Sequence, residues 1–342
     1  MNRQDNGGTP ARSATFSALL PKAIRIVAHI IILLIIVQAI TGILLSLHYV
    51  PDTHAAEVQA RPGTIVHATQ LLVGGSPKGL SDGSQAPSDT LALAGQHALV
   101  PAGVNDVVPS VAAASVNLTI EHHVVGGSVV RAIHHTNTTL LIVLTVILCV
   151  LLAVGRAWRM HPTVWVAVII GLMVLMASAF TGRLLPDDVY SYVSASIVRH
   201  ELSEFPLGSS LVTMLGLNAS ESARLSTPYA IHALSLPCFL AFGVCVLWRR
   251  WGRPSASTVL ACALGVAFVV ALSSLMAAPY YPVRDVSGAV EQSVSVAPWW
   301  PFVVPNAVVT WFGGELAGYL AAAFILALLL LPLYLRSSPS DS

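Results

Sequence analysis

The sequence predicts an all-α integral membrane protein with six transmembrane helices. Of its 342 residues, 55% are hydrophobic and only 10% are charged, whereas soluble globular domains have about 25% charged residues. Six apolar stretches are long enough to cross the roughly 30 Å hydrocarbon core as helices: 24–49, 129–155, 162–183, 228–248, 257–279 and 315–335. This composition excludes a soluble protein, and the net charge of +1 gives no reason to expect a nucleic acid partner.

The positions of Lys and Arg indicate how these helices are oriented, because cations gather on the cytoplasmic side of short loops. Ten of the 17 lie before or at the start of the first stretch, in the two short connections 156–161 and 249–256, or after the last stretch; the other seven lie on the opposite side, five in three longer loops and two at the ends of stretches. We therefore expect both termini in the cytoplasm, with loops 50–128, 184–227 and 280–314 outside. Residues 1–20 are polar and lack the layout of a cleavable signal. The expected protein is multi-pass in a bacterial-type inner membrane.

The three outer loops differ in composition. Residues 57–108 are rich in Gly, Ala, Ser and Pro and lack periodicity, which predicts an irregular insertion with at most one short helix. The 184–227 loop alternates polar and apolar residues at helical spacing, which predicts one or two amphipathic helices at the membrane surface. In the third loop, the tryptophans of Pro298-Trp299-Trp300-Pro301 are typical of a membrane interface.

The 129–155 stretch carries Arg131, His134 and His135 near its outer end. Ionisable residues inside a membrane helix are costly, so they indicate a functional site. His232 lies about four residues into 228–248, and under this topology it shares the depth of His134. Two neutral imidazoles that face each other across a bundle are a natural axial pair for haem iron. His135 points about 100° away from His134, so only one of the two faces the partner; His134 is favoured and His135 is the alternative.

Two further features bear on this haem hypothesis. Arg131 lies one turn outward from His134, where it can meet a haem propionate. The competing explanation is that these are hydrogen-bonded histidines near helix ends, and from the residues alone the two explanations have equal weight.

All four cysteines lie in apolar runs without a CxxC or CxxCH motif, which excludes covalent c-type haem attachment and a thiol-redox motif.

Several segments together resemble cytochrome b of the quinol-oxidising, Rieske-containing respiratory and photosynthetic complexes. The matching segments are QAITGILLSLHYVPDT, SVVRAIHHTN, AFTGRLLP, the 190–206 stretch, YAIHALSLP and PWWP. The resemblance covers nearly all of 24–335 outside the insertion. It implies a haem-binding four-helix bundle over 24–253, a C-terminal region of two helices and a short cytoplasmic tail over 254–342, and a cytoplasmic segment over 1–23.

The resemblance also implies non-covalent haem b and partners. The family pattern has two stacked haems, each held between two histidines and two glycines that repeat about fourteen residues apart. The outer set is present as Gly42, Gly182, His134 with Arg131, and His232. The inner positions are apolar: Ala28, Leu148, Val168, and Val246 or Leu247. We therefore expect one haem b per chain near the outer face, since packing atoms must fill an absent haem's space.

The quinol-oxidation motifs depart from the family. The family's Pro-Glu-Trp-Tyr motif has a proton-accepting glutamate, and Pro298-Trp299-Trp300-Pro301 has no carboxylate. The family's Pro-Trp-Gly becomes Pro186-Asp187-Asp188. Asp187 and Asp188 are candidates for proton transfer, although exposed loop acids are the favoured interpretation. The family's arginine ahead of the histidine in 228–248 falls on Thr227 or Pro228.

These observations predict a monohaem cytochrome b-like subunit that relays electrons at the outer face of a quinol-oxidising or related respiratory complex. In the family, the two electrons of a quinol are split and one of them crosses the membrane to an inner quinone site. That full cycle is not expected from this chain, because without an inner haem the electron would have to cross roughly half a bilayer or more in one step. The implied partners are membrane lipid, a quinol or quinone, a Rieske-type iron–sulfur protein and a cytochrome c-like subunit, in a homodimer or larger complex. The alternative is a structural paralogue that scaffolds a membrane complex, with no haem or no turnover of its own.

Overall fold

The computed structural model describes residues 10–56, 109–203, 208–220, 223–251, 254–275, 278, 283–284 and 300–334. Over these residues the chain is helical, with two isolated β-bridges, Ala55–Ser110 and Asp188–Val283, and no strand. The all-α prediction is therefore confirmed. The 57–108 insertion and Pro298-Trp299 lie outside the described residues, as does the side chain of Trp300.

Five described helical segments are long and apolar enough to cross a membrane: Leu20–Ser46, Gly127–Val154, Pro162–Leu184, Ser226–Cys245 and Ala256–Leu275. They belong to α1 (Pro10–Ser46), α4 (Gly127–Val154), α6 (Pro162–Leu184), the run of α9 (Ser226–Ala230), η4 (Ile231–Ser235) and α10 (Leu236–Trp251), and α11 (Ala256–Leu275). The sixth predicted stretch forms α13 (Gly314–Tyr334), whose apolar part is shorter, Leu316–Pro332. The chain is an integral multi-pass membrane protein.

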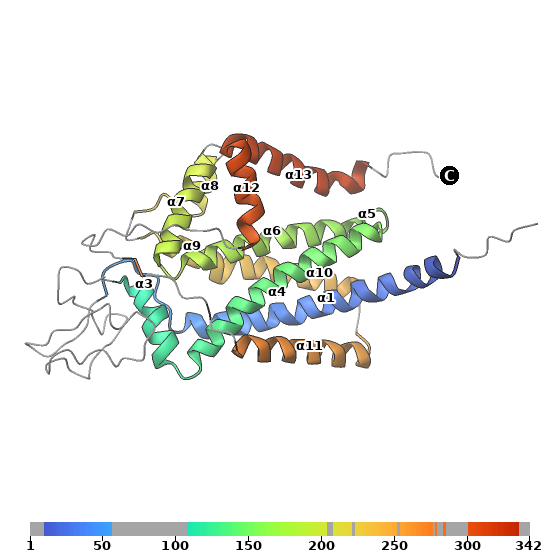
Figure 1. Cartoon of the computed structure of the whole chain (residues 1–342), viewed down its shortest axis with the longest axis horizontal. Helices are drawn as coiled ribbons and strands as arrows, with labels where there is room; N and C mark the ends of the chain where they lie inside the picture. Colours follow the sequence, from blue (N-terminus) through green and yellow to red (C-terminus); the bar gives the residue numbers. More distant parts are fainter. Residues whose placement is uncertain are drawn as a thin grey trace, which may run out of the picture.

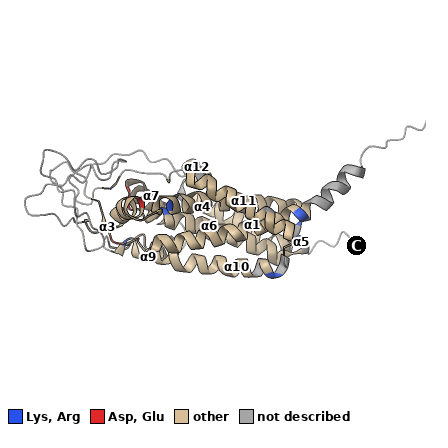
Figure 2. Ribbon diagram, turned by 90° about the horizontal axis from the view of Figure 1, so that it is seen from below, with Lys and Arg blue, Asp and Glu red and all other residues tan. Residues whose placement is uncertain are grey.

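The spanning helices form one bundle in which α1 packs on α4, α6 packs on α4 and α10, and α11 packs on α1 and α4 (Figure 1). α13 is attached to this bundle through α6, since the indole N–H of Trp165 donates to the Leu328 carbonyl at 2.7 Å. Pro162 stands in the first turn of α6, where its missing N–H costs nothing. Among the residues that the structure describes, Lys, Arg, Asp and Glu lie toward the two ends of the bundle and leave its middle without coloured charges (Figure 2).

The loop between α1 and α4 contains helix that the sequence analysis did not predict. After the predicted 57–108 insertion, this loop forms α3 (Val111–Ala114) and the π-helix η2 (Ser115–His123). The Ser110 hydroxyl starts this structure by accepting from the Ala113 N–H at 3.1 Å, an N-cap that the loop composition does not reveal. Gly126, at φ +74°, then turns the chain into α4.

The 184–227 loop forms two helices, α7 (Val189–Ser203) and α8 (Gly208–Met214), within the range predicted. They lie across one end of the bundle and contact each other (Figure 1). The C-terminal part continues through η5 (Trp300–Phe302) and α12 (Val303–Phe312) into α13. Phe302 contacts Phe180 of α6 with ring centres 6.1 Å apart, so α12 begins against the end of the bundle that bears α7.

Candidate functional site

His134 and His232 face each other near the end of the bundle that carries α7. His134 lies in α4 and His232 in η4, and their ring centres are 6.1 Å apart with 68° between the ring planes. Imidazole nitrogens bind a transition metal at about 2 Å, so a shared metal ion holds two ring centres roughly 6 Å apart. The separation of these two rings therefore fits a bis-imidazole metal site.

Two glycines make room for these rings. A Cβ atom on Gly182 of α6 would lie 2.4 Å from Cε1, 2.9 Å from Nδ1 and 3.1 Å from Nε2 of His232. A Cβ atom on Gly42 of α1 would lie 3.2 Å from Cε1 of His134. A side chain at either position would therefore press against a histidine ring. In this structure the space left by the two glycines is taken by the imidazoles themselves rather than by a porphyrin edge.

Hydrogen bonds fix the same tautomer in both neutral rings. Nδ1 of His232 is 2.9 Å from the Ser178 carbonyl oxygen, and a carbonyl only accepts, so Nδ1 carries the proton. Nδ1 of His134 is 3.0 Å from the Thr41 hydroxyl, which already donates to the Val37 and Gln38 carbonyls. The His134 Nδ1–H therefore donates to Thr41. Each ring is left with its Nε2 lone pair for another partner, as a metal-binding histidine requires.

The Nε2 atom of His134 has such a partner within the protein. The Gln38 side-chain amide is 3.0 Å from it and also donates to the Thr138 hydroxyl at 2.8 Å. The Gln38 carbonyl oxygen accepts from the fully buried Asn137 at 2.7 Å. Sequence reasoning missed Gln38, Thr41 and Asn137, and the available signal was the four-residue interval that puts Gln38 on the Gly42 side of its helix.

The π-helical segment η4 is a second feature that the sequence did not reveal. His232 is its second residue, and the Leu236 N–H donates to the Ile231 carbonyl, the i→i+5 bond of a π-helix. Single π turns inside α-helices recur at functional sites. Here the wider turn sits at the residue that faces His134.

Arg131 and His135 are engaged away from the pair of facing rings. Nη1 of Arg131 bonds Oε2 of Glu121 on η2 at 2.8 Å, with the two side chains 16% and 25% exposed. His135 is within electrostatic reach of Arg183 and Arg131 rather than of His232. Of the two adjacent histidines, His134 is the one that contacts His232.

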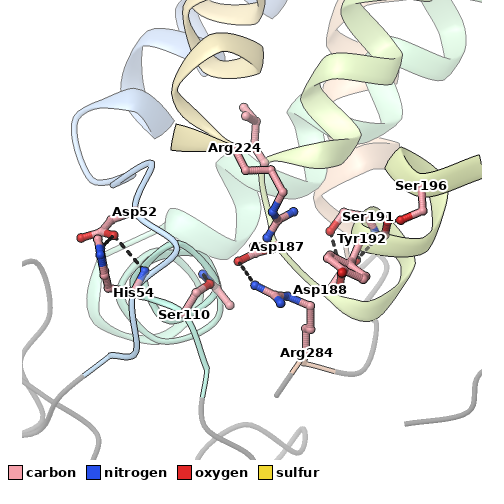
Figure 3. A network of polar contacts seen from close by, with 12 residues as sticks. Asp52, His54, Ser110, Asp187, Asp188, Ser191, Tyr192, Ser196, Arg224 and Arg284 are labelled. Carbon is pink, nitrogen blue, oxygen red and sulfur yellow. Dashed lines mark hydrogen bonds and ion pairs between the residues drawn. The ribbon is translucent and has the colours of Figure 1, made fainter. Parts of the chain in front are cut away.

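Asp187 and Asp188 are buried, 0% and 4% exposed, so the favoured interpretation of them as exposed loop acids is wrong. Asp188 binds Arg183 at 3.0 Å and accepts the Ser191 N–H at 2.7 Å. Asp187, at φ +50°, pairs with Arg224 and lies 3.5 Å from Arg284. Figure 3 shows Arg224 and Arg284 approaching Asp187 from two separate segments. Asp187 is buried with arginines from two other segments against it, whereas Asp188 pairs with the nearby Arg183 of α6.

At the other end of the bundle, the positions that lack the family's inner haem residues pack together. Ala28 of α1, Leu148 of α4 and Val168 of α6 are 1%, 1% and 4% exposed and belong to one hydrophobic cluster. That cluster also contains Leu141, Leu152 and Trp165, among others. The side chains of Val246 and Leu247 lie outside the described residues. The inner positions on three helices are therefore filled by one apolar core.

Comparison with known proteins supports this reading of the fold. Residues 106–248 match the sequence profile of the family described as Cytochrome b/b6/petB. A chain of a solved structure titled "Hyperthermophilic respiratory Complex III" superposes with a TM-score of 0.60 and 16% identity, over 91% of this chain and 75% of that chain. The chain is thus similar to cytochrome b in sequence over residues 106–248, and over most of its length its fold is similar to that of the Complex III chain.

Proposed function

We propose that this protein is a monohaem cytochrome b subunit that relays single electrons near the outer face of the membrane. The observation that carries the proposal is the facing pair His134 and His232, with ring centres 6.1 Å apart and both Nδ1 atoms engaged as donors. Their two Nε2 atoms would hold the iron of a haem b. The haem, when bound, supplies reversible one-electron chemistry.

The residues of the chain would prepare this site in three ways. Thr41 and the Ser178 carbonyl orient the two rings and raise the basicity of Nε2. Gly42 and Gly182 let the imidazoles lie against α1 and α6. The two histidines lie among the spanning helices, and the charged residues that the structure describes lie toward the ends of the bundle (Figure 2). Metal coordination at His134 requires the Gln38 amide to leave Nε2.

Support for one haem, rather than two, comes from the packed inner core. Ala28, Leu148 and Val168 stand at the positions that the resemblance pairs with the inner haem, and all three are buried in one cluster. A porphyrin at that level would need space that these side chains and their neighbours fill. Protein interiors are close-packed, so this core and an inner haem exclude each other.

We propose that the subunit works within a multi-subunit, quinol-oxidising respiratory complex in a bacterial-type inner membrane, with both termini cytoplasmic. A Rieske-type protein and a cytochrome c-like subunit are the expected redox partners. The ion pairs of Asp187 with Arg224 and of Asp188 with Arg183 argue against either carboxylate as the proton acceptor for quinol. We therefore assign quinol deprotonation to groups other than these two.

The alternative is a scaffold subunit without haem, and one observation favours it. The Gln38 amide occupies Nε2 of His134, so both ring nitrogens of that histidine are satisfied by protein groups. A network that is complete without a cofactor is what a structural paralogue would keep. The two functions differ in haem content, which is directly measurable.

The test is a pyridine haemochrome assay on the purified full chain. The electron-relay function predicts one haem b per chain, and this haem should be lost in His134→Ala and in His232→Ala. It also predicts a single one-electron step in a redox titration. His200→Ala, exposed on α7, is the matched control and should keep its haem. A stoichiometry of zero supports the scaffold, two refutes the monohaem assignment, and loss in His135→Ala but not in His134→Ala refutes the ligand assignment.

A further inference from the structure

A small polar cavity lies at the outer-loop end of the bundle, apart from the facing histidines. It lies between one face of α7 and residues 217–219 and 224–225, beside Leu184 of α6, and has a volume of about 80 Å³. The face of α7 contributes residues at helical spacing: Tyr192, Ala195, Ser196 and Arg199. The opposite wall is formed by Leu217, Ala219, Arg224 and Leu225.

The lining of this cavity is suited to an anion. Two arginines from different segments, Arg199 and Arg224, line it, and none of the described lining residues carries a carboxylate. Arginine presents a planar fork of donors that matches phosphate and carboxylate oxygens. The hydroxyl of Tyr192 is a further potential donor in the lining.

Arg224 is held in position before any ligand arrives. Its guanidinium pairs with Asp187, which is 0% exposed, and lies over the Tyr192 ring at 5.2 Å. Arg284 lies over the same ring at 4.7 Å and also reaches Asp187 (Figure 3). A guanidinium fixed by an ion pair and a ring loses little freedom on binding a ligand, which favours affinity.

The size and place of the cavity favour a phosphate group. A cavity needs about 10–15 Å³ for each water-sized occupant, so 80 Å³ admits about five to eight heavy atoms, enough for the five of a phosphate. Apolar side chains are exposed on the two surface helices beside it: Ile197 on α7, and Leu211 and Met214 on α8, at 44%, 38% and 61%. Helices with apolar residues exposed in this way lie at the lipid boundary, where phosphodiester head groups are found.

We propose that the cavity lined by Arg199, Arg224 and Tyr192 binds a phosphate-type anion, either the phosphodiester of a membrane lipid or free phosphate. The site is independent of the proposed haem. It would tie α7 and the 217–225 segment to the membrane surface.

Native mass spectrometry of the full chain in detergent, titrated with defined ligands, tests this proposal. The probes are phosphatidylglycerol, phosphatidylcholine, diacylglycerol as a lipid without phosphate, and inorganic phosphate as a competitor. Arg199→Gln is the main variant because Arg199 is exposed and its loss leaves the Asp187 pair intact. Arg249→Gln, an exposed arginine of α10 at the other end of the bundle, is the matched control for loss of one positive charge.

We expect the first phosphatidylglycerol to bind Arg199→Gln at least about fivefold more weakly than the wild type. This is the effect expected for the loss of a partly exposed charge-assisted hydrogen bond. Arg249→Gln should not affect that step. Displacement by inorganic phosphate identifies a free anion as a ligand, whereas its failure to compete identifies the lipid head group. Equal binding of diacylglycerol and phosphatidylglycerol, or equal effects of the two arginine variants, would overturn the proposal.

Discussion

The close contact between Gly182 and His232 makes Gly182→Ala the sharpest test of the candidate haem site. The added Cβ would stand 2.4 Å from Cε1 of His232 and about as close to both ring nitrogens, at 2.9 and 3.1 Å. The ring has little room to retreat, because its Nδ1–H bond to the Ser178 carbonyl is 2.9 Å long. The alanine must therefore displace the imidazole, break that hydrogen bond, or push α6 away.

The cost follows from the two effects that the displacement combines. Overpacking a filled site costs about 1–3 kcal/mol, and a lost hydrogen bond about 0.5–1.5 kcal/mol. Replacing a mid-helix glycine returns about 0.5–1 kcal/mol of helix stability. The net penalty is about 0.5–4 kcal/mol, which weakens haem retention between about twofold and several hundredfold.

The assay is haem content per chain by pyridine haemochrome, followed during competition with a haem-scavenging protein. Gly171→Ala is the matched control, because it lies on the same helix and its Cβ would meet nothing within 4 Å. Gly42→Ala should fall between the two, since its Cβ would meet Cε1 of His134 at 3.2 Å. If Gly182→Ala retains haem as well as Gly171→Ala does, then His232 is not an axial ligand in this geometry.

Three other variants probe the rest of the bundle. Leu148→Ala should lower the free energy of unfolding by about 2–5 kcal/mol, as for other buried leucines, and leave haem content unchanged; chemical denaturation with parallel haem assays checks both. Asp187→Asn should lower the free energy of unfolding by about 3–5 kcal/mol, because it leaves two largely buried guanidinium groups without their carboxylate. Limited proteolysis of the loops around Asp187 should then be faster than in the wild type. The pKa of Tyr49 is raised above its ordinary value of about 10, mainly by burial and next by the negative charge of Asp187. Since the unfolded chain releases this proton first, thermal melts should show stability falling above about pH 10, with the fall reduced in Tyr49→Phe.

The spanning helices were predictable because a single local property determines them. An uninterrupted apolar run needs no partner to be recognised, and the third predicted stretch, 162–183, differs from α6 by one residue. Proline at its start and arginines before it mark the boundary in the sequence. The contact between His134 and His232 was likewise predictable from their positions along the helices. Two parallel helices that each carry a histidine near the same end place the two histidines at one level in the membrane.

The polar contacts around these residues were not predictable, because each joins segments far apart in sequence. Gln38 reaches His134 across 96 residues, and Arg224 reaches Asp187 across 37. Adjacent aspartates in a loop look solvent-exposed until the arginines that bury them are placed. The π turn at His232 lies just before Pro237, whose missing N–H interrupts helical hydrogen bonding, but a proline alone does not specify a π turn.

The two ends of the bundle differ in a way that a single substitution cannot reverse. At the end that carries α7, α1 and α4 meet through hydrogen bonds among Gln38, Thr41, His134 and Asn137, and under the proposed function a metal would replace the Gln38 amide at His134. At the inner end the same helices meet through Ala28 and Leu148 within a closed apolar cluster. A histidine at position 148 would bring an imidazole into that cluster without a polar partner from the inner positions of α1 and α6, at a cost of about 1–3 kcal/mol or more for the unsatisfied ring nitrogens. A second haem would require coordinated replacement on several helices, which is why the proposed electron relay is confined to the outer end.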